Sequence, residues 1–331
     1  MGQQRTTIAV DAVSGDGGPE TVLAAARLAL ANDPDVLLRL VVDPAGAGRL
    51  SAFGLDRDER VEIVEAGHVL PMDVGTSQAI RRGPGSSMQL ALEEVESGRA
   101  GAMVSGGNTG ALMALGRQCL GMLPGVERPA LMAALPSVDA SVWVLDLGAN
   151  VGVNAHRLCE FAQLGSTAVR VLTGRRPRIG VLNIAREPGK GPDVVREAAR
   201  LIEAQPGLEL SGFVEADQLF AGAVDLVVCD GFAGNVLLKG AEGMARLMFG
   251  QLSKGLTGLP GLICRRAVAR LYDRLEPSRH NGAPLLGVRG IVIKSHGGAC
   301  ERGFASAIEL AALEARRNLI PELEDALWGS D

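Results

Sequence analysis

Five short polar segments contain the residues best suited to binding or polarising an anion. Most are rich in glycine, which lets backbone N–H groups converge on a ligand. A helix that begins at such a turn adds the positive end of its dipole. From these segments and the residues just beyond them we select candidates for binding substrate or phosphate, namely Asp11, Gly15, Asp16, Gly17, Ser105, Asn108, Thr109, Asn183, Asp230, Lys239 and His296.

Two further residues are candidates for catalysis. Lys190 lies in a loop between Gly189 and Gly191, where its ammonium can stabilise a phosphate or an oxyanion. Asn235 closely follows an apolar run, where its amide can orient a substrate. Each motif also has a plainer interpretation: Lys190 as a solvated surface lysine, and the polar turns as helix caps. The first turn lacks both GxGxxG spacing and the Walker lysine, so no nucleotide cofactor is predicted.

The five cysteines argue against a disulfide framework and against a zinc site. They are far apart, odd in number and include no CxxC pair, a usage typical of a reducing cytoplasm. Cys229 ends the apolar run 226–229, so burial is a better interpretation than a role as nucleophile. The histidines show no spacing suited to a metal, and we predict no metal and no other cofactor.

Short β-rich runs alternate with helical patterns along the chain. This alternation predicts an α/β fold with a mainly parallel sheet and helices on both faces. The predicted strands are 8–13, 36–42, 61–64, 102–105, 142–145, 179–184, 226–229 and 290–293. The predicted helices include 20–30, 86–97, 109–120, 157–172 and 193–203. We expect a single domain over residues 1–331, with a helical excursion at about 243–277.

The polar segments fall at the carboxyl ends of predicted strands, where open α/β sheets bind ligands. We therefore expect the turns to meet on one edge of the sheet and to form a single crevice. The net charge of −5 disfavours nucleic acid as a partner. One helical pattern, 263–276, places Arg266, Arg270 and Arg274 on one face, as a docking stripe for an acidic partner or an anionic membrane surface. A solvated basic edge is the alternative.

Taken together, eight motifs in order resemble those of the PlsX-type phosphate acyltransferases. The resemblance covers nearly the whole chain, from Ile8 to about Ala312. The motifs are Asp11–Pro19, Ser86–Met88, Val104–Met113, Leu145–Val151, Asn183–Gly191, Val227–Lys239, Gly282–Gly287 and Gly290–Gly297. The chain departs from the family pattern at Arg186-Glu187-Pro188, in the loop that leads to Lys190.

The resemblance implies a fold like that of the isocitrate and isopropylmalate dehydrogenases, and a homodimer. It implies transfer of an acyl group from an acyl carrier protein to inorganic phosphate, with the positions of Lys190 and Asn235 in the active site. It also implies a cytoplasmic protein with loose, peripheral membrane contact through residues 243–277. A dehydrogenase on the same fold, or a non-catalytic module that binds a carrier protein or a membrane, are the alternatives.

The candidate residues suit that chemistry. Phosphate is already anionic and needs positioning more than a base, and a thiolate, whose thiol has a pKa of about 8.5, leaves readily. The remaining barrier is charge developing on the thioester oxygen and repulsion between anions. Preorganised donors lower such a barrier by about 3 kcal/mol each, a role we give to Lys190 and Asn235. Backbone N–H groups of 15–18 and 105–109 would hold phosphate and pantetheine.

Overall fold

The computed structural model describes residues 5–138, 141–255 and 281–328. The strands of this part are β1 (Thr6–Asp11), β2 (Val36–Val42), β3 (Val61–Glu65), β4 (Ala102–Ser105), β5 (Ala130–Pro136), β6 (Ser141–Leu145), β7 (Arg178–Leu182), β8 (Glu209–Val214), β9 (Leu226–Val228), β10 (Ala283–Leu286) and β11 (Ile291–Lys294). The helices are α1 (Gly18–Asn32), α2 (Pro44–Ala47), α3 (Thr76–Arg82), α4 (Ser87–Glu96), α5 (Thr109–Leu120), α6 (Ala155–Thr173), α7 (Asp193–Glu203), α8 (Gly231–Gly255), α10 (Glu301–Arg316) and α11 (Leu319–Trp328), with short 3₁₀ turns at Leu50–Phe53 and Gln218–Ala221.

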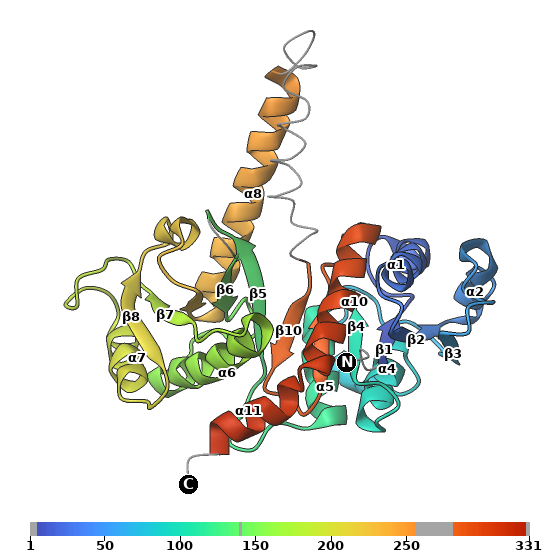
Figure 1. The fold of residues 1–331 in the computed structure, drawn as a ribbon, viewed down its shortest axis with the longest axis horizontal. Helices are drawn as coiled ribbons and strands as arrows, with labels where there is room; N and C mark the ends of the chain where they lie inside the picture. The colour runs from blue at the N-terminus through green and yellow to red at the C-terminus, as the bar shows by residue number, and fades with distance from the viewer. Residues whose placement is uncertain (1–4, 139–140, 256–280, 329–331) are drawn as a thin grey trace.

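One sheet runs through the molecule, with the strand order β3-β2-β1-β4-β11-β10-β5-β6-β9-β7-β8 (Figure 1). Most neighbouring strands are parallel, and the exceptions are the pairs β10–β11, β10–β5 and β5–β6. The prediction of an α/β fold with a mainly parallel sheet is confirmed.

The sheet separates two apolar cores, because successive side chains of a strand point to opposite faces. In β1, Ile8 and Val10 belong to one core and Ala9 to the other. Helices α1, α6, α7, α10 and α11 contribute to the first core, and α3, α4 and α5 to the second. Helices therefore cover both faces, as the sequence predicts.

The predicted element bounds agree best where a buried apolar run has clear ends. The predicted runs 36–42 and 102–105 match β2 and β4, and 109–120 and 193–203 match α5 and α7. The patterns do not predict β5, β8 or β10. β5 consists mainly of Ala, Leu and Met, which favour helix, and β10 is a four-residue strand between two glycines. Tertiary pairing, not local preference, makes these segments extended.

The three antiparallel pairings reverse the strand direction across the middle of the sheet. β1, β4 and β11 run one way, whereas β6, β7 and β9 run the other. The expectation that all polar turns share one edge of the sheet is therefore wrong, because it requires every strand to point the same way. The turns form two groups, one for each strand direction.

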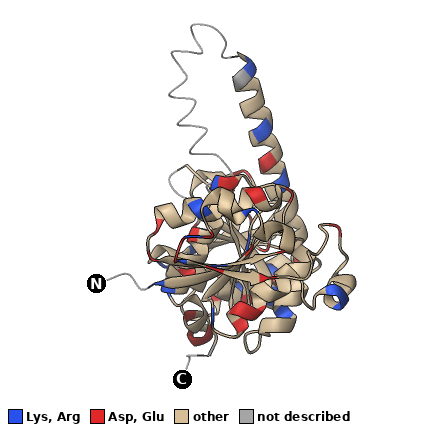
Figure 2. Ribbon diagram, turned by 90° about the vertical axis from the view of Figure 1, so that its right-hand side faces the viewer, with Lys and Arg blue, Asp and Glu red and all other residues tan. Residues whose placement is uncertain are grey.

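Helix α8 begins at the second group and then extends away from the body of the molecule (Figure 1). It includes residues 243–255 of the predicted helical excursion, and 256–277 lie outside the described residues. Its outer turns expose Met244, Leu247 and Met248, with only a few charged residues between apolar ones (Figure 2). Among the described helices, none is both long and apolar enough to cross a bilayer.

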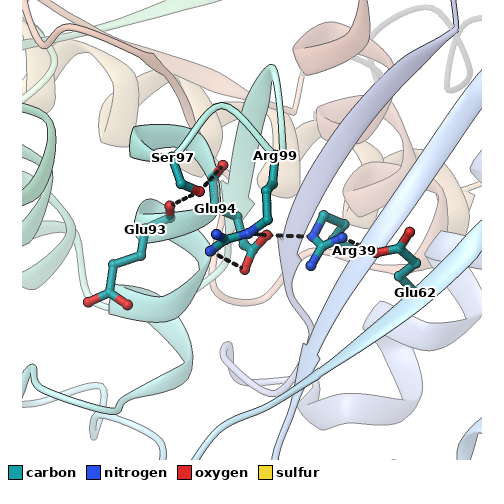
Figure 3. A network of polar contacts seen from close by, with 6 residues as sticks. All are labelled: Arg39, Glu62, Glu93, Glu94, Ser97 and Arg99. Carbon is teal, nitrogen blue, oxygen red and sulfur yellow. Dashed lines mark hydrogen bonds and ion pairs between the residues drawn. The ribbon is translucent and has the colours of Figure 1, made fainter.

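A partly exposed ion-pair network, with the buried Glu94 at its centre, fastens the outer strands to α4 (Figure 3). Glu94 accepts hydrogen bonds from Arg99 Nε at 2.8 Å and Arg99 Nη2 at 3.0 Å, and it also pairs with Arg39. Arg39 pairs in turn with Glu62 of β3. Burial alone would raise the pKa of Glu94, but the two arginines outweigh it, so the pKa lies below its usual value. The network lies away from the polar turns and is structural.

Glu314 of α10 is a buried carboxyl without a compensating cation. The residue is 1% exposed, and its Oε1 has no hydrogen-bond partner among the residues that the structure describes. It borders a small cavity whose lining includes Leu286, Ile291 and Leu323. Burial raises the pKa of Glu314 well above its usual value, because the charged form is poorly solvated there.

We predict that Glu314→Gln changes how stability depends on pH. A raised folded-state pKa means that the wild type is most stable below the unfolded pKa of about 4.3 and loses stability as pH rises toward the folded pKa. Gln cannot ionise, so the melting temperature of the variant relative to wild type should rise as the pH increases above the unfolded pKa, until the pH passes the folded pKa of Glu314. Thermal unfolding at several pH values measures this difference. Exposed Glu324→Gln is the control. If the melting temperatures of Glu314→Gln and wild type differ by the same amount at every pH, the pKa of Glu314 is not raised in the folded protein.

Candidate active site

The first group of turns follows β1, β4 and β11 and is held together by short contacts. We call it the glycine-turn cluster, residues 11–17, 105–107 and 294–298. The N–H of Asp16 donates to the carbonyl of Gly297 at 2.8 Å, and Ser14 and Ser105 hydroxyls lie 3.2 Å apart. Gly15 has a positive φ of 104°, and a Cβ there would lie 3.2 Å from the Gly297 carbonyl. Only glycine satisfies both demands without strain.

Buried polar groups lie beneath this cluster. Ser105 Oγ donates to Asp11 Oδ2 at 2.7 Å, and Gly107 N donates to Ser105 Oγ at 3.1 Å. Asp11 is fully buried, and burial raises its pKa although the hydrogen bond from Ser105 counteracts the effect. Its Oδ1 has no hydrogen-bond partner in the described residues, nor does the buried Ser87 Oγ. Asp11 and Ser105 are therefore buried groups that hold the turns together, and they do not line an open surface.

Several backbone N–H groups in these turns are free for a ligand. Those of Gly15, Gly17, Thr109 and Gly110 donate to no acceptor in the described part of the chain. Asn108 caps α5 by accepting from Ala111 N at 2.8 Å, while its amide donates to the Met72 carbonyl at 2.6 Å. The helix-cap interpretation of Asn108 is confirmed, and the start of α5 still offers two free donors.

His296 is held in one tautomer by its own turn. Gly298 N donates to His296 Nδ1 at 3.1 Å, so Nδ1 is the acceptor and the proton of the neutral ring is on Nε2. Asn281 Oδ1 accepts from the backbone N–H of His296 at 2.9 Å. Partial burial lowers the pKa of His296, and the positive charge of Lys239 lowers it further. The ring is thus a neutral hydrogen-bond donor near pH 7.

The second group of turns follows β6, β7 and β9, where the start of α8 meets the loop after β6. Asp146 is fully buried and accepts from Leu131 N at 2.9 Å and from Asn150 N at 2.6 Å. A Cβ on Gly231 would lie 2.4 Å from the Asn150 carbonyl, and one on Gly234 would lie 2.0 Å from the Asp146 carbonyl. The glycines thus allow α8 to approach this loop closely.

Two of the sequence candidates are fully engaged by backbone groups. Asp230 accepts from the N–H groups of Gly152 and Phe232, at 2.7 and 2.8 Å, and so fixes both the β6 loop and the first turn of α8. Asn183 donates to the Lys190 carbonyl at 3.1 Å and accepts from Ile184 N at 2.9 Å. These contacts give Asp230 and Asn183 the task of shaping loops.

Lys190 and Asn235, by contrast, have free side chains. Lys190 is exposed, and its ammonium forms no ion pair or hydrogen bond with the described residues. Asn235 is exposed beside Gly148, whose added Cβ would lie 3.4 Å from that of Asn235. β7 and β9 pair in parallel with Val181 opposite Val228, so the loop that carries Lys190 and the first turns of α8, which carry Asn235, leave the sheet side by side.

Lys239 of α8 links the two groups electrostatically. Its charge lowers the pKa of both His296 and Lys294, so α8 brings the second group toward the glycine-turn cluster. Lys239 itself is half-exposed and pairs with Glu242 at 3.0 Å. A residue of the helix that begins at the second group thus lies close enough for its charge to affect the glycine-turn cluster.

The remaining predictions have different outcomes. Cys229 is buried as predicted, and burial strongly raises the pKa of its thiol. Within the described ranges, no group of His, Cys, Asp and Glu side chains is arranged to hold a metal ion. Arg266, Arg270 and Arg274 lie outside the described residues.

Comparison with known proteins decides the family. The family model described as "Fatty acid synthesis protein" matches residues 6–321. A phosphate acyltransferase from Legionella pneumophila strain Paris is 44% identical over 328 residues, covering 97% of this chain and 96% of the relative. One from Pseudomonas putida strain GB-1 is 46% identical over 326 residues, covering 97% of each. The chain belongs to this family. It is an acyltransferase.

Solved structures support the fold of this acyltransferase. A phosphotransacetylase from Streptococcus pyogenes aligns with a TM-score of 0.63 at 19% identity, over 95% of both chains. A 4-hydroxythreonine-4-phosphate dehydrogenase from Klebsiella pneumoniae aligns with a TM-score of 0.56 at 15% identity, over 96% of this chain and 100% of that one. At such low identity these likenesses establish a shared dehydrogenase-like architecture and nothing about substrate.

Sequence reasoning missed several buried residues that organise the two groups of turns. Asp146 and Asn150 lie in a motif that was recognised but given no role. Lys294 directly follows the apolar run 290–293 and precedes a polar turn. A charged residue at the end of a buried strand is a signal in itself, because burying a charge is costly unless it has partners.

We predict that Cys229→Ala keeps most of its activity and that no acyl-enzyme forms. The thiol is buried against the Asp146 carbonyl, and its raised pKa suppresses the nucleophilic thiolate. Steady-state turnover and intact-protein mass spectrometry after rapid quenching measure the two outcomes. Exposed Cys300→Ala is the control. An acyl group trapped on Cys229 would replace direct attack by the acceptor with a two-step route.

Proposed function

We propose that this acyltransferase moves an acyl group from the thioester of an acyl carrier protein to inorganic phosphate. The products are free carrier protein and an acyl phosphate for phospholipid synthesis. The observation that carries the proposal is the near-full-length match with proteins named phosphate acyltransferase. We also propose that the fold is of the isocitrate and isopropylmalate dehydrogenase type, which the likeness to another dehydrogenase supports.

The free donors of the glycine-turn cluster and α5 support a phosphate site. Gly15 and Gly17 on one side, and Thr109 and Gly110 on the other, offer N–H groups that are unpaired within the described residues, from turns that touch each other. The N-terminus of α5 adds a favourable dipole for an anion. The neutral Nε2–H of His296 is a further donor from the same cluster. Phosphate held by such donors attacks the thioester carbonyl as an oxygen nucleophile, and the thiolate leaves without strong acid assistance.

Lys190 and Asn235 suit stabilisation of the transition state. Neither side chain has a hydrogen-bond or ion-pair partner among the described residues, and the loop of Lys190 and the helix of Asn235 follow neighbouring strands. A cation and an amide donor there would stabilise charge on the thioester oxygen and reduce its repulsion with phosphate.

The partners follow from the same proposal. An acyl carrier protein is acidic, so Arg266, Arg270 and Arg274 are its proposed docking stripe, with an anionic membrane surface as the alternative. We further propose a cytoplasmic homodimer with peripheral membrane contact through the segment that begins on α8. The exposed Met244, Leu247 and Met248 support contact of that helix with an apolar surface.

The direct test is an acyl-transfer assay with purified protein, acyl carrier protein thioester and inorganic phosphate. Hydroxylamine converts an acyl phosphate to a hydroxamate, while a thiol reagent detects the released carrier. Both products should appear in equal amounts and only when phosphate is present. Acyl-coenzyme A in place of the carrier thioester tests donor choice. Release of free fatty acid without hydroxamate would identify a hydrolase and refute the proposal.

We predict that Lys190→Ala lowers kcat about a hundredfold, the typical cost of losing one oxyanion-type donor. The melting temperature should hardly change, because an exposed substitution typically alters stability by about 0.5 kcal/mol or less. Lys190→Arg should also be impaired, since a planar guanidinium does not replace a compact ammonium.

Arg186→Ala is the matched control for Lys190→Ala, because Arg186 is an exposed cation in the same loop. It should retain nearly full turnover at saturating substrates. Equal losses in the two variants would indicate a general effect of loop charge, and near-normal turnover by Lys190→Ala would remove Lys190 from the mechanism.

A further inference from the structure

Lys294, at the end of β11, is a buried lysine in the centre of the glycine-turn cluster. The residue is 7% exposed. Its Nζ donates to the Gly106 carbonyl at 3.4 Å and also to the Ser295 carbonyl. A buried ammonium with two carbonyl acceptors from different turns joins the segment after β4 to the segment after β11.

The Gly106–Gly107 peptide is held from both sides. Lys294 binds its carbonyl oxygen, while its N–H, on Gly107, donates to Ser105 Oγ at 3.1 Å. Ser105 is anchored in turn on Asp11. This continuous chain of hydrogen bonds fixes the orientation of the turn that leads to the free N–H groups of Thr109 and Gly110. A small rotation of the peptide would redirect those donors.

Three charged side chains act on the ammonium of Lys294. Asp16, from the turn after β1, and Asp11 beneath it favour the protonated form, whereas Lys239 of α8 opposes it. Burial is the largest effect and lowers the pKa of Lys294 to about 8. The neighbouring His296 is largely neutral at that pH, because its own pKa is lowered.

We propose that Lys294 is a positioning residue that couples phosphate binding to its own protonation. The ammonium holds the two turns in the arrangement that binds phosphate, and the bound anion stabilises the ammonium. The inference rests on the proposed function of the glycine-turn cluster. Because binding and protonation are linked, each must strengthen the other by the same factor. Phosphate affinity is then full while free Lys294 is protonated and falls as the pH rises through its pKa.

The test is the pH profile of kcat/KM for phosphate at saturating acyl donor, which reports ionisations of the form that binds phosphate. The wild type should lose activity above about pH 8, in line with the pKa of Lys294. Lys294→Met should raise KM for phosphate at least about tenfold at pH 7, with a smaller change in kcat, and should abolish the alkaline fall. Circular dichroism and thermal unfolding confirm that the variant is folded.

Two surface variants test the assignment without altering Lys294. Asp16→Asn removes a negative charge that favours the ammonium, so the alkaline fall should move to lower pH. Lys239→Met removes an opposing positive charge, so the fall should move to higher pH. Exposed Lys254→Met, near the far end of α8, is the control and should leave the profile in place.

The outcomes separate this inference from the proposed function. If wild-type protein forms no acyl phosphate from phosphate and acyl carrier protein thioester, the proposed function fails. If it does, but folded Lys294→Met keeps the wild-type alkaline fall, Lys294 is not the coupled group. Shifts of the fall in the same direction for Asp16→Asn and Lys239→Met would also overturn the inference. Opposite shifts, with the fall absent in Lys294→Met, support it.

Discussion

The reversal of strand direction at β10 and β5 is the constraint on which the rest of the site depends. It divides the polar turns into a group after β1, β4 and β11 and a group after β6, β7 and β9. A catalytic site that uses both groups therefore needs an element that crosses between them. Helix α8 is that element, because it starts at the second group and places Lys239 within electrostatic reach of Lys294 and His296.

Close backbone approach determines where α8 begins. Gly231 and Gly234 leave no space for a Cβ against the loop after β6, and Asp230 binds N–H groups on both sides of the junction. Beneath the junction, the buried Asp146 satisfies both of its oxygens with donors from the loop and from β5. The first turn of α8 is thus fixed by several independent contacts. Asn235 lies on the second turn of α8 and is therefore held in place by these contacts, which suits the role in transition-state stabilisation proposed for it.

Buried polar residues have different hydrogen-bond surroundings in the two groups of turns. Asp146 is surrounded by donors, whereas Asp11 keeps one oxygen without a partner in the described residues. Lys294 bridges two turns, and nearby carboxylates partly offset the effect of burial on its ammonium charge. Polar groups in a low-dielectric interior interact strongly, so changing one alters its neighbours. The glycine-turn cluster is therefore best regarded as one coupled unit.

The sequence alone determined the fold class, most strands and helices, and the family-specific motifs. Apolar runs and helical spacing reflect burial along a short stretch of chain, which is why β2, β4, α5 and α7 could be predicted with their ends. Lys190 and Asn235 could also be selected as candidates from the sequence, because polar residues in glycine-rich segments are local signals. Only the tertiary structure decided that β5 and β10 are strands, that the sheet reverses, and that Asp230 and Asn183 shape loops. It also placed Lys294 against Gly106, which is 188 residues away in the chain. Pairing partners and strand directions depend on contacts between distant residues, and no local pattern encodes them.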